Sequence, residues 1–240
     1  MDCGAELPPS PVTPAPVTPP PVAPSPVAPS PRVMWQCLFP GLLLVALITL
    51  INVVLALALR NQPALPLAYE VLAAVAFAAL VAAFLFLGER QLVRELMTRP
   101  VIKLSTVAIT VAALAVMMLF MSGYVACLRH FGFDVHNSMR RFVDAGWNMD
   151  ATLLLLSVAP AVTEEIAFRG ILLARLDGVF GRNEALLVQA ALFGIVHMLP
   201  LTFASHFVLG LALGFVRRRT GNLYSCMVVH AAYNAWAVLV

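Results

Sequence analysis

Long apolar stretches dominate this sequence and restrict its fold more than any other feature. They lie at about residues 38–59, 66–88, 104–128, 151–178, 184–199, 201–216 and 222–240. Each of the first three can cross a hydrocarbon core of about 30 Å, at about 1.5 Å per helical residue. The fifth and sixth are short, are joined at Pro200, and predict a hairpin that barely spans. We therefore predict an all-α, polytopic helical membrane protein with about seven transmembrane helices, six or eight being the alternatives.

The composition excludes a water-soluble domain. The chain is 61% apolar and only 11% charged, whereas soluble domains are about 25% charged. Its net charge of +3 does not require a nucleic-acid partner, because the basic residues lie between the apolar stretches, where they act as topology signals. With seven spans and the N-terminus inside, eleven of the 15 Lys and Arg residues lie on the inner side. This bias predicts a cytoplasmic N-terminus and an outward C-terminus.

The chain divides into a tail and a membrane domain. Residues 1–32 are rich in proline and contain the pentads PVTPA, PVTPP, PVAPS and PVAPS. This composition predicts a disordered, extended tether, or alternatively a docking site for a proline-binding module. Residues 33–240 are predicted to form a single transmembrane domain, with its catalytic core in 151–240. Two connecting segments, 89–103 and 129–150, have the amphipathic character of interfacial anchors.

The adjacent acids Glu164 and Glu165 are the most unusual feature of the fourth apolar stretch. The other acidic residues lie in tails, loops or flanks. A single charged residue at a membrane helix centre costs roughly 2.5–3.5 kcal/mol on insertion scales, so such residues usually mark a functional site. Glu165 and Arg169 form an i, i+4 pair that can neutralise one carboxylate. Glu164 then points about 100° away and is free to act on another group. Pro160 is expected to kink the helix just before the doublet.

Hairpin geometry predicts which residues meet Glu164. The fourth and fifth stretches form an antiparallel hairpin with its turn near Gly181; Glu164 lies 17 residues before that turn and His197 lies 16 after it. The two side chains should therefore face each other at nearly the same height. The last stretch adds His230 and, at i+4 on the same face, Asn234.

Two further stripes accompany these residues. Gln189 and Phe193 share an i, i+4, i+8 stripe with His197, whereas His206 shares one with Gly210 and Gly214. The second stripe has the G-x-x-x-G spacing of close helix packing, so His206 is expected to pack against a neighbour.

Each candidate also has a purely structural interpretation. Glu165 and Arg169 can be an ion pair that only holds helices together. His197 and His230 can be hydrogen-bonded packing residues, and Asn234 can bridge two helices. For Glu164 this interpretation is weak, because the sequence shows no second cation near it.

Three motifs in order resemble those of the CPBP intramembrane protease family, which contains the type II CAAX prenyl endopeptidases and bacterial relatives linked to bacteriocin processing and self-immunity. They are E-E-x-x-x-R (Glu164, Glu165, Arg169), F-x-x-x-H (Phe193, His197) and H-x-x-x-N (His230, Asn234). The resemblance covers about residues 151–240. It implies that Glu164 is the general base that activates water, that His197 is a second catalytic group, and that His230 and Asn234 complete the site.

The sequence defines the cofactor and the substrate less closely than the site residues. The resemblance admits either a metalloprotease or a metal-independent glutamate protease. Two His and one Glu (Glu164, His197, His230) could hold zinc with an open position. However, the sequence has no H-E-x-x-H motif, and its four scattered cysteines form no C-x-x-C pair. The implied substrate is a membrane-associated protein or peptide, with a prenylated one among the candidates.

We therefore predict an intramembrane endopeptidase of the CAAX protease type that hydrolyses a peptide bond by Glu-activated water. The expected location is the bacterial inner membrane, with the endoplasmic reticulum as the alternative. Two other functions are considered: a proton-coupled carrier, disfavoured because no internal repeat is evident, and a non-enzymatic membrane scaffold or immunity protein.

Overall fold

The computed structural model describes residues 30–59, 66–97, 103–133, 138–198 and 200–239. The predicted tail therefore lies outside the described residues, apart from its last three. In its N-terminal half the chain forms α1 (Pro31–Leu59), α2 (Pro66–Phe84), η1 (Leu85–Glu89), α3 (Arg90–Met97), α4 (Leu104–His130) and α5 (Ser138–Asp144). The all-α prediction is confirmed for the described part of the chain.

The C-terminal half contains one long helical rod and three further helices. The rod comprises α6 (Met149–Leu153), η2 (Leu154–Val158), α7 (Ala159–Glu164), η3 (Glu165–Leu172) and α8 (Leu173–Asp177). Its two π-helical segments, η2 and η3, lie on either side of Pro160, and the backbone keeps right-handed helical angles at each junction. The remaining helices are α9 (Arg182–Ile195), α10 (Pro200–Thr220) and α11 (Tyr224–Leu239).

Five helical segments are long and apolar enough to cross a membrane. They are Pro31–Ala58, Ala68–Met97, Leu104–His130, Met149–Asp177 and Pro200–Thr220. The other two predicted spans correspond to α9 and α11, which are helices of 14 and 16 residues. The chain is thus an integral membrane protein by length and composition of its helices, and the count of seven stays a prediction.

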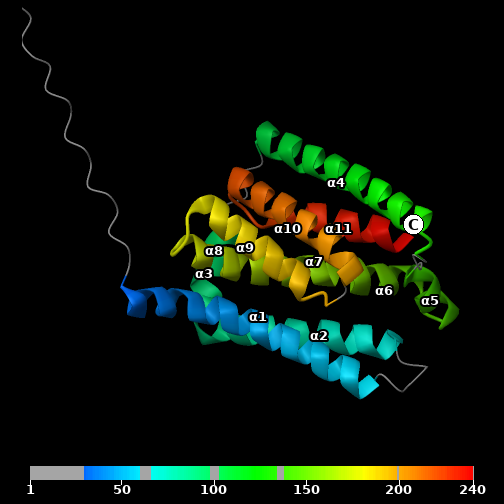
Figure 1. Cartoon of the computed structure of the whole chain (residues 1–240), viewed down its shortest axis with the longest axis horizontal. Coiled ribbons are helices and arrows are strands. Elements are labelled where there is room, and N and C mark those ends of the chain that lie inside the picture. Colours follow the sequence, from blue (N-terminus) through cyan, green and yellow to red (C-terminus); the bar gives the residue numbers. More distant parts are fainter. Residues whose placement is uncertain (1–29, 60–65, 98–102, 134–137, 199, 240) are drawn as a thin grey trace, which may run out of the picture.

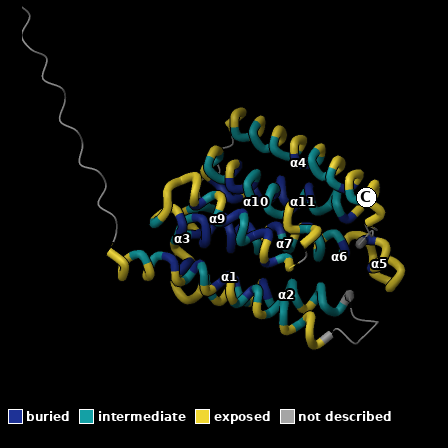
Figure 2. Tube along the Cα trace, in the orientation of Figure 1, coloured by how far each residue is buried: buried dark blue, intermediate teal, exposed yellow. Residues whose placement is uncertain are grey.

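The helices run back and forth along one direction (Figure 1). α1 and α2 lie side by side on one face, α4 covers α10 and α11 on the opposite face, and the rod and α9 lie between them. Burial is concentrated in this middle layer (Figure 2). Outer helices instead expose large apolar side chains such as Val75, Val111 and Leu119. An apolar exterior around a buried polar centre is the arrangement that lipid requires of a helical bundle.

Two glycines shape the fold, Gly88 through its positive φ and Gly210 through a close helix contact. At Gly88, φ is +152°, so the chain can change direction between α2 and α3. At Gly210 an added Cβ would lie 2.8 Å from the Ala190 Cα, because α10 packs backbone to backbone on α9. This contact confirms the close packing predicted from the G-x-x-x-G spacing.

Candidate active site

The acidic doublet lies at the junction of α7 and η3, in the middle of the rod. Glu165 forms an ion pair with Arg169, with 2.8 Å between Oε1 and Nη1, and neither side chain is exposed. The second guanidinium nitrogen, Nη2, donates to the Gly210 carbonyl of α10 at 3.3 Å. The predicted Glu165–Arg169 pair is therefore confirmed, and it also fastens the rod to α10.

His230 of α11 lies between the two carboxylates. Its Nδ1 is 2.8 Å from Glu165 Oε1, and its Nε2 is 3.8 Å from Glu164 Oε2. Because an ionised carboxylate only accepts hydrogen bonds, Nδ1 carries the proton and Nε2 is left facing Glu164. Glu165 thus orients His230 as well as neutralising Arg169. The sequence predicted the Arg169 contact but not this second one.

Phe193 of α9 packs at the centre of the cluster. The Arg169 guanidinium lies 4.3 Å from its ring centroid, within the range of a cation–π contact. The rings of Phe168, His197 and His230 meet the Phe193 ring edge to face, at centroid distances of 5.0, 5.0 and 5.9 Å. Phe193 is fully buried, so this predicted supporting residue holds the cationic and imidazole groups in fixed positions.

His197 lies in the turn that follows α9. Its Nδ1 lies 2.7 Å from the Phe193 carbonyl oxygen, and because a carbonyl only accepts, Nδ1 carries the proton and Nε2 is available. His206 of α10 has the same arrangement, with Nδ1 2.7 Å from the Thr202 carbonyl. The two imidazole rings stack at 3.6 Å between centroids. His206 therefore packs against a neighbour, as predicted, and that neighbour is His197.

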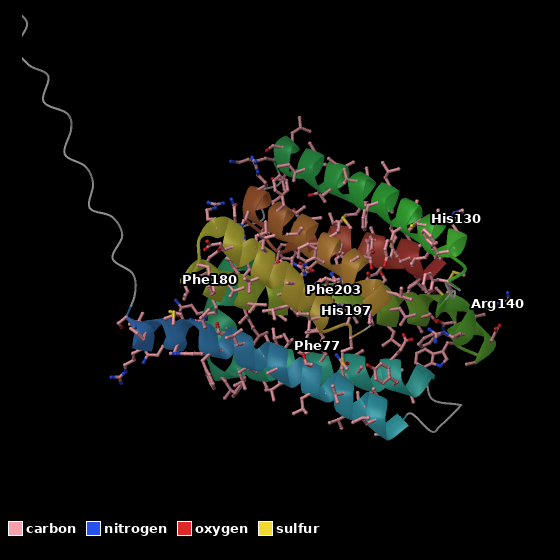
Figure 3. The ribbon with its side chains drawn as sticks, in the orientation of Figure 1. Phe77, His130, Arg140, Phe180, His197 and Phe203 are labelled. Carbon is pink, nitrogen blue, oxygen red and sulfur yellow. The ribbon has the colours of Figure 1, made fainter. Side chains whose placement is uncertain are left out.

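Glu164 and His197 line one cavity of about 320 Å³. The cavity lies between the rod on one side and α1 and α2 on the other, and Phe77 of α2 faces it opposite His197 (Figure 3). Its walls are mainly apolar, with polar groups from three helices (α1, α2 and α7) and the turn after α9: Asn52, Tyr69, Glu70, Thr163, Glu164 and His197. The facing of Glu164 and His197 predicted from the hairpin is confirmed. The contribution of α1 and α2 was not predicted.

The charges of the cluster do not balance. Two buried or half-buried carboxylates, Glu164 and Glu165, meet one guanidinium, Arg169, so one negative charge remains unless His230 is protonated. Glu164 Oε2 is buried and has no hydrogen-bond partner among the described residues. A buried acceptor without a partner is costly. Glu165 Oε2 also has no partner among the described residues, but Glu164 lines the cavity, so its carboxylate is the one that a water or substrate proton can meet there.

Asn234 occupies a different position from the other predicted site residues. It lies on α11, one turn after His230, is half-buried, and does not line the cavity. The structure thus brings Glu164 and His197 to the cavity and places Glu165, Arg169, Phe193 and His230 behind them. It does not bring Asn234 to the same space.

The fit of these residues to a metal ion can be tested directly. Within the described ranges, no group of three or more His, Cys, Asp and Glu side chains is arranged to hold a metal ion. In this arrangement Glu164, His197 and His230 are not grouped as a zinc site.

The residues form a buried cluster of carboxylate and imidazole groups inside a helical membrane bundle. Residues 146–236 match the family described as type II CAAX prenyl endopeptidase Rce1-like. This segment is a domain of that family and contains every site residue predicted from the sequence, so the resemblance is confirmed for the C-terminal part of the chain. α1, α2 and α4 lie outside it. No curated protein and no solved structure matches the chain.

Proposed function

We propose that this protein is an intramembrane endopeptidase that hydrolyses a peptide bond in a membrane-associated protein or peptide. The observation that carries the proposal is the shared cavity, which Glu164 lines from the rod and His197 from the turn after α9, within a segment that matches a prenyl endopeptidase family. The cavity is lined mostly by apolar side chains and lies inside the helical bundle, which suits a substrate segment entering from the membrane.

In this proposal Glu164 is the general base. A water molecule in the cavity gives one proton to the Glu164 carboxylate, and its oxygen attacks the scissile carbonyl carbon. The tetrahedral intermediate then expels the amine, which takes the proton back from Glu164 as the C–N bond breaks. His197 Nε2, which carries no proton in the neutral ring, accepts a hydrogen bond from the second water hydrogen and orients the attack.

The remaining predicted residues support these two. His230 Nε2 faces Glu164 Oε2, so it accepts a hydrogen bond from the protonated carboxyl group while Glu164 holds the proton. Glu165 keeps His230 in the tautomer that makes this possible. The family resemblance implies that Asn234 completes the site, and an amide group there could donate to the oxyanion. Its position one turn beyond His230 does not support direct contact with a substrate in the cavity.

The same proposal covers the extent of the domain, its orientation in the membrane and its substrate. Residues 33–240 act as one transmembrane domain, since α1 and α2 supply one wall of the cavity and the C-terminal helices the other. We place the N-terminus on the cytoplasmic side of a bacterial inner membrane, following the bias of basic residues. A prenylated peptide is one substrate candidate, in line with the family.

The test uses the purified protein in bilayer discs and a library of membrane-linked peptides. Glu164→Gln removes the base without changing side-chain volume and should lower kcat by about 10²- to 10⁴-fold. Glu89→Gln is the matched control, because Glu89 is also buried in a helix but pairs with Arg175, away from the cavity. Cleavage by Glu164→Gln at the parent rate would exclude Glu164 as the general base and this cavity as the proposed active site. Biological function without any cleavage would support a scaffold instead. Chelation followed by zinc addition in the same assay tests metal dependence.

A further inference from the structure

The turn after α9 holds His197 outside any helix. α9 ends at Ile195, and residues 196–198 form a turn in which Met198 has φ +55°. Carbonyls at a helix C-terminus have no partner within their own helix. The Phe193 carbonyl is satisfied by the His197 ring. The Val196 carbonyl belongs to the peptide that joins Val196 to His197, and its partner comes from elsewhere in the fold.

That partner is Asn52 of α1. Asn52 Nδ2 donates to the Val196 carbonyl oxygen at 3.3 Å, across 144 residues of sequence. Tyr69 of α2 in turn donates its hydroxyl to Asn52 Oδ1 at 3.3 Å. Both side chains line the cavity. A hydrogen-bonded chain therefore runs from α2 through α1 to the backbone that carries His197.

We propose that Asn52, oriented by Tyr69, is a positioning residue that holds the turn of His197 in the geometry needed for peptide hydrolysis. This inference rests on the proposed peptidase function. It also gives α1 and α2, which lie outside the matched segment 146–236, a role in the reaction.

The chemistry of the two side chains explains why they act together. An amide has one acceptor and one donor end. Because the tyrosine hydroxyl donates to Oδ1, the Nδ2 group is the end that faces Val196. Apolar neighbours from the same two helices, Ile48 and Phe77, line the cavity beside them. Hydrogen bonds are stronger in such a low-dielectric environment than in water, so the chain restrains the turn effectively.

The restraint acts on the backbone, and other contacts fix the ring. The Phe193 carbonyl and the stacked His206 ring set the direction of the His197 imidazole relative to α9 and α10. Without Asn52, the peptide between Val196 and His197 loses its tie to α1, and the whole turn can shift away from Glu164. A displacement of about 1 Å at a reacting group can cost about 10²-fold in rate.

Two variants of Asn52 test the proposal. Asn52→Leu and Asn52→Asp both remove the donor, and they differ in charge. Each should lower kcat at least about tenfold while KM stays within about twofold, because the substrate is still bound but the reacting geometry is lost. Thr49→Val is the matched control: Thr49 lies one turn before Asn52 on α1, and its hydroxyl donates within that helix, to the Val45 carbonyl.

Hydrogen–deuterium exchange of the peptide containing residues 196–198 supplies a readout independent of activity. Exchange should be faster in Asn52→Leu and Asn52→Asp, and unchanged in Thr49→Val. Tyr69→Phe should produce a smaller effect alone and add nothing to Asn52→Leu, since both changes break one chain.

The outcomes separate this proposal from the proposed function. If the parent cleaves peptides but Asn52→Leu keeps its kcat, the positioning role is wrong. A rise in KM alone would make Asn52 a substrate contact, and a loss in Asn52→Asp alone would be an effect of charge; either result overturns the proposal. If the parent cleaves nothing, the peptidase function fails. Exchange at residues 196–198 then decides by itself whether Asn52 restrains the turn.

Discussion

Glu165 shows how a single carboxylate can be kept inside the bundle. Its side chain is fully buried, yet it receives hydrogen bonds from Arg169 and His230 through one oxygen, Oε1. Burying two charges costs several kcal/mol per ion unless the geometry is good and other hydrogen bonds help. Here Arg169 also reaches the Gly210 carbonyl and the Phe193 ring. The pair is therefore a structural support beside Glu164, the proposed general base.

Removing one partner of the Glu165–Arg169 pair should destabilise the protein more than removing both. Arg169→Leu leaves the Glu165 carboxylate buried without its cation and should lower the free energy of unfolding by about 3–5 kcal/mol. Arg169→Leu combined with Glu165→Leu leaves no uncompensated charge, so the double variant should be more stable than Arg169→Leu alone. Unfolding in mixed detergent micelles, followed by circular dichroism, measures both. A double variant that is less stable than Arg169→Leu would contradict this account of the pair.

At the residue scale, sequence spacing predicted the contacts that depend on helix geometry alone. The i, i+4 pair of Glu165 and Arg169 and the facing of Glu164 and His197 are of this kind. The contact of His230 with Glu165 depends on how α11 is rotated against the rod, which no local spacing determines. The stacking of His206 on His197 could have been predicted from the sequence. His197 lies three residues before Pro200 and His206 lies six after it, so the turn at Pro200 brings them close together.

The hairpin of α9 and α10 is the element that brings the histidine stack and the Arg169 acceptor together. The two helices approach closely at Gly194, Gly210 and Gly214. The Gly210 position matters most, because its Cα faces the Ala190 backbone and its carbonyl accepts from Arg169. A side chain there would push α10 away from α9 and from the rod at once.

A set of glycine variants tests this packing. Gly210→Ala should destabilise the protein by about 1–3 kcal/mol and lower its activity, because the Ala190 backbone cannot move aside. Gly214→Ala should cost less, since its new methyl group meets the end of the flexible Leu186 side chain. Gly123→Ala on α4 is the control, because no atom lies within 4 Å of its added Cβ. If the three variants have equal free energies of unfolding in the detergent assay, close packing at Gly210 does not stabilise the fold.

At the element scale, most helices were predictable and their irregularities were not. The stretches predicted at 104–128 and 201–216 correspond to α4 and α10 within a few residues, because apolar length alone defines them. α1 begins at Pro31, seven residues before the predicted start, because proline is tolerated in the first turn of a helix. The π-helical segments of the rod depend on tertiary packing. Pro160 therefore indicated an irregular helix nearby, but not its type or its extent.

On the scale of the whole molecule, the cavity is built from two parts of the chain that the sequence treats differently. The C-terminal helices carry the motifs and the family match. α1 and α2 carry no motif, yet they supply Asn52, Tyr69 and the apolar wall. Nothing in local sequence indicates that these two helices face the rod, since their apolar residues are spread around the helix surface. Only the packed structure shows that both parts form one site.

The two ends of the bundle differ in charge. One end holds Arg175 paired with Glu89, and Arg218 paired with Asp177, which tie η1, α8 and α10 together. Phe180 lies at this end, and His130 and Arg140 lie at the other (Figure 3). The inner side predicted from the basic residues corresponds to the end of Phe180, because the arginines of α3, α8 and α10 gather there.

This asymmetry predicts which turns reach which side of the membrane, and single cysteines in a cysteine-free variant test it. Ala145→Cys and Leu201→Cys should react with an impermeant maleimide in intact cells, and Phe180→Cys only after permeabilisation. Leu201 is the decisive position, because α9 has 14 residues and is only about 21 Å long at about 1.5 Å per residue. Labelling at 201 in intact cells shows that this short helix crosses a locally thinned bilayer and supports seven spans. Labelling at 201 only after permeabilisation would mean that α9 does not cross, and the seven-span topology would be wrong.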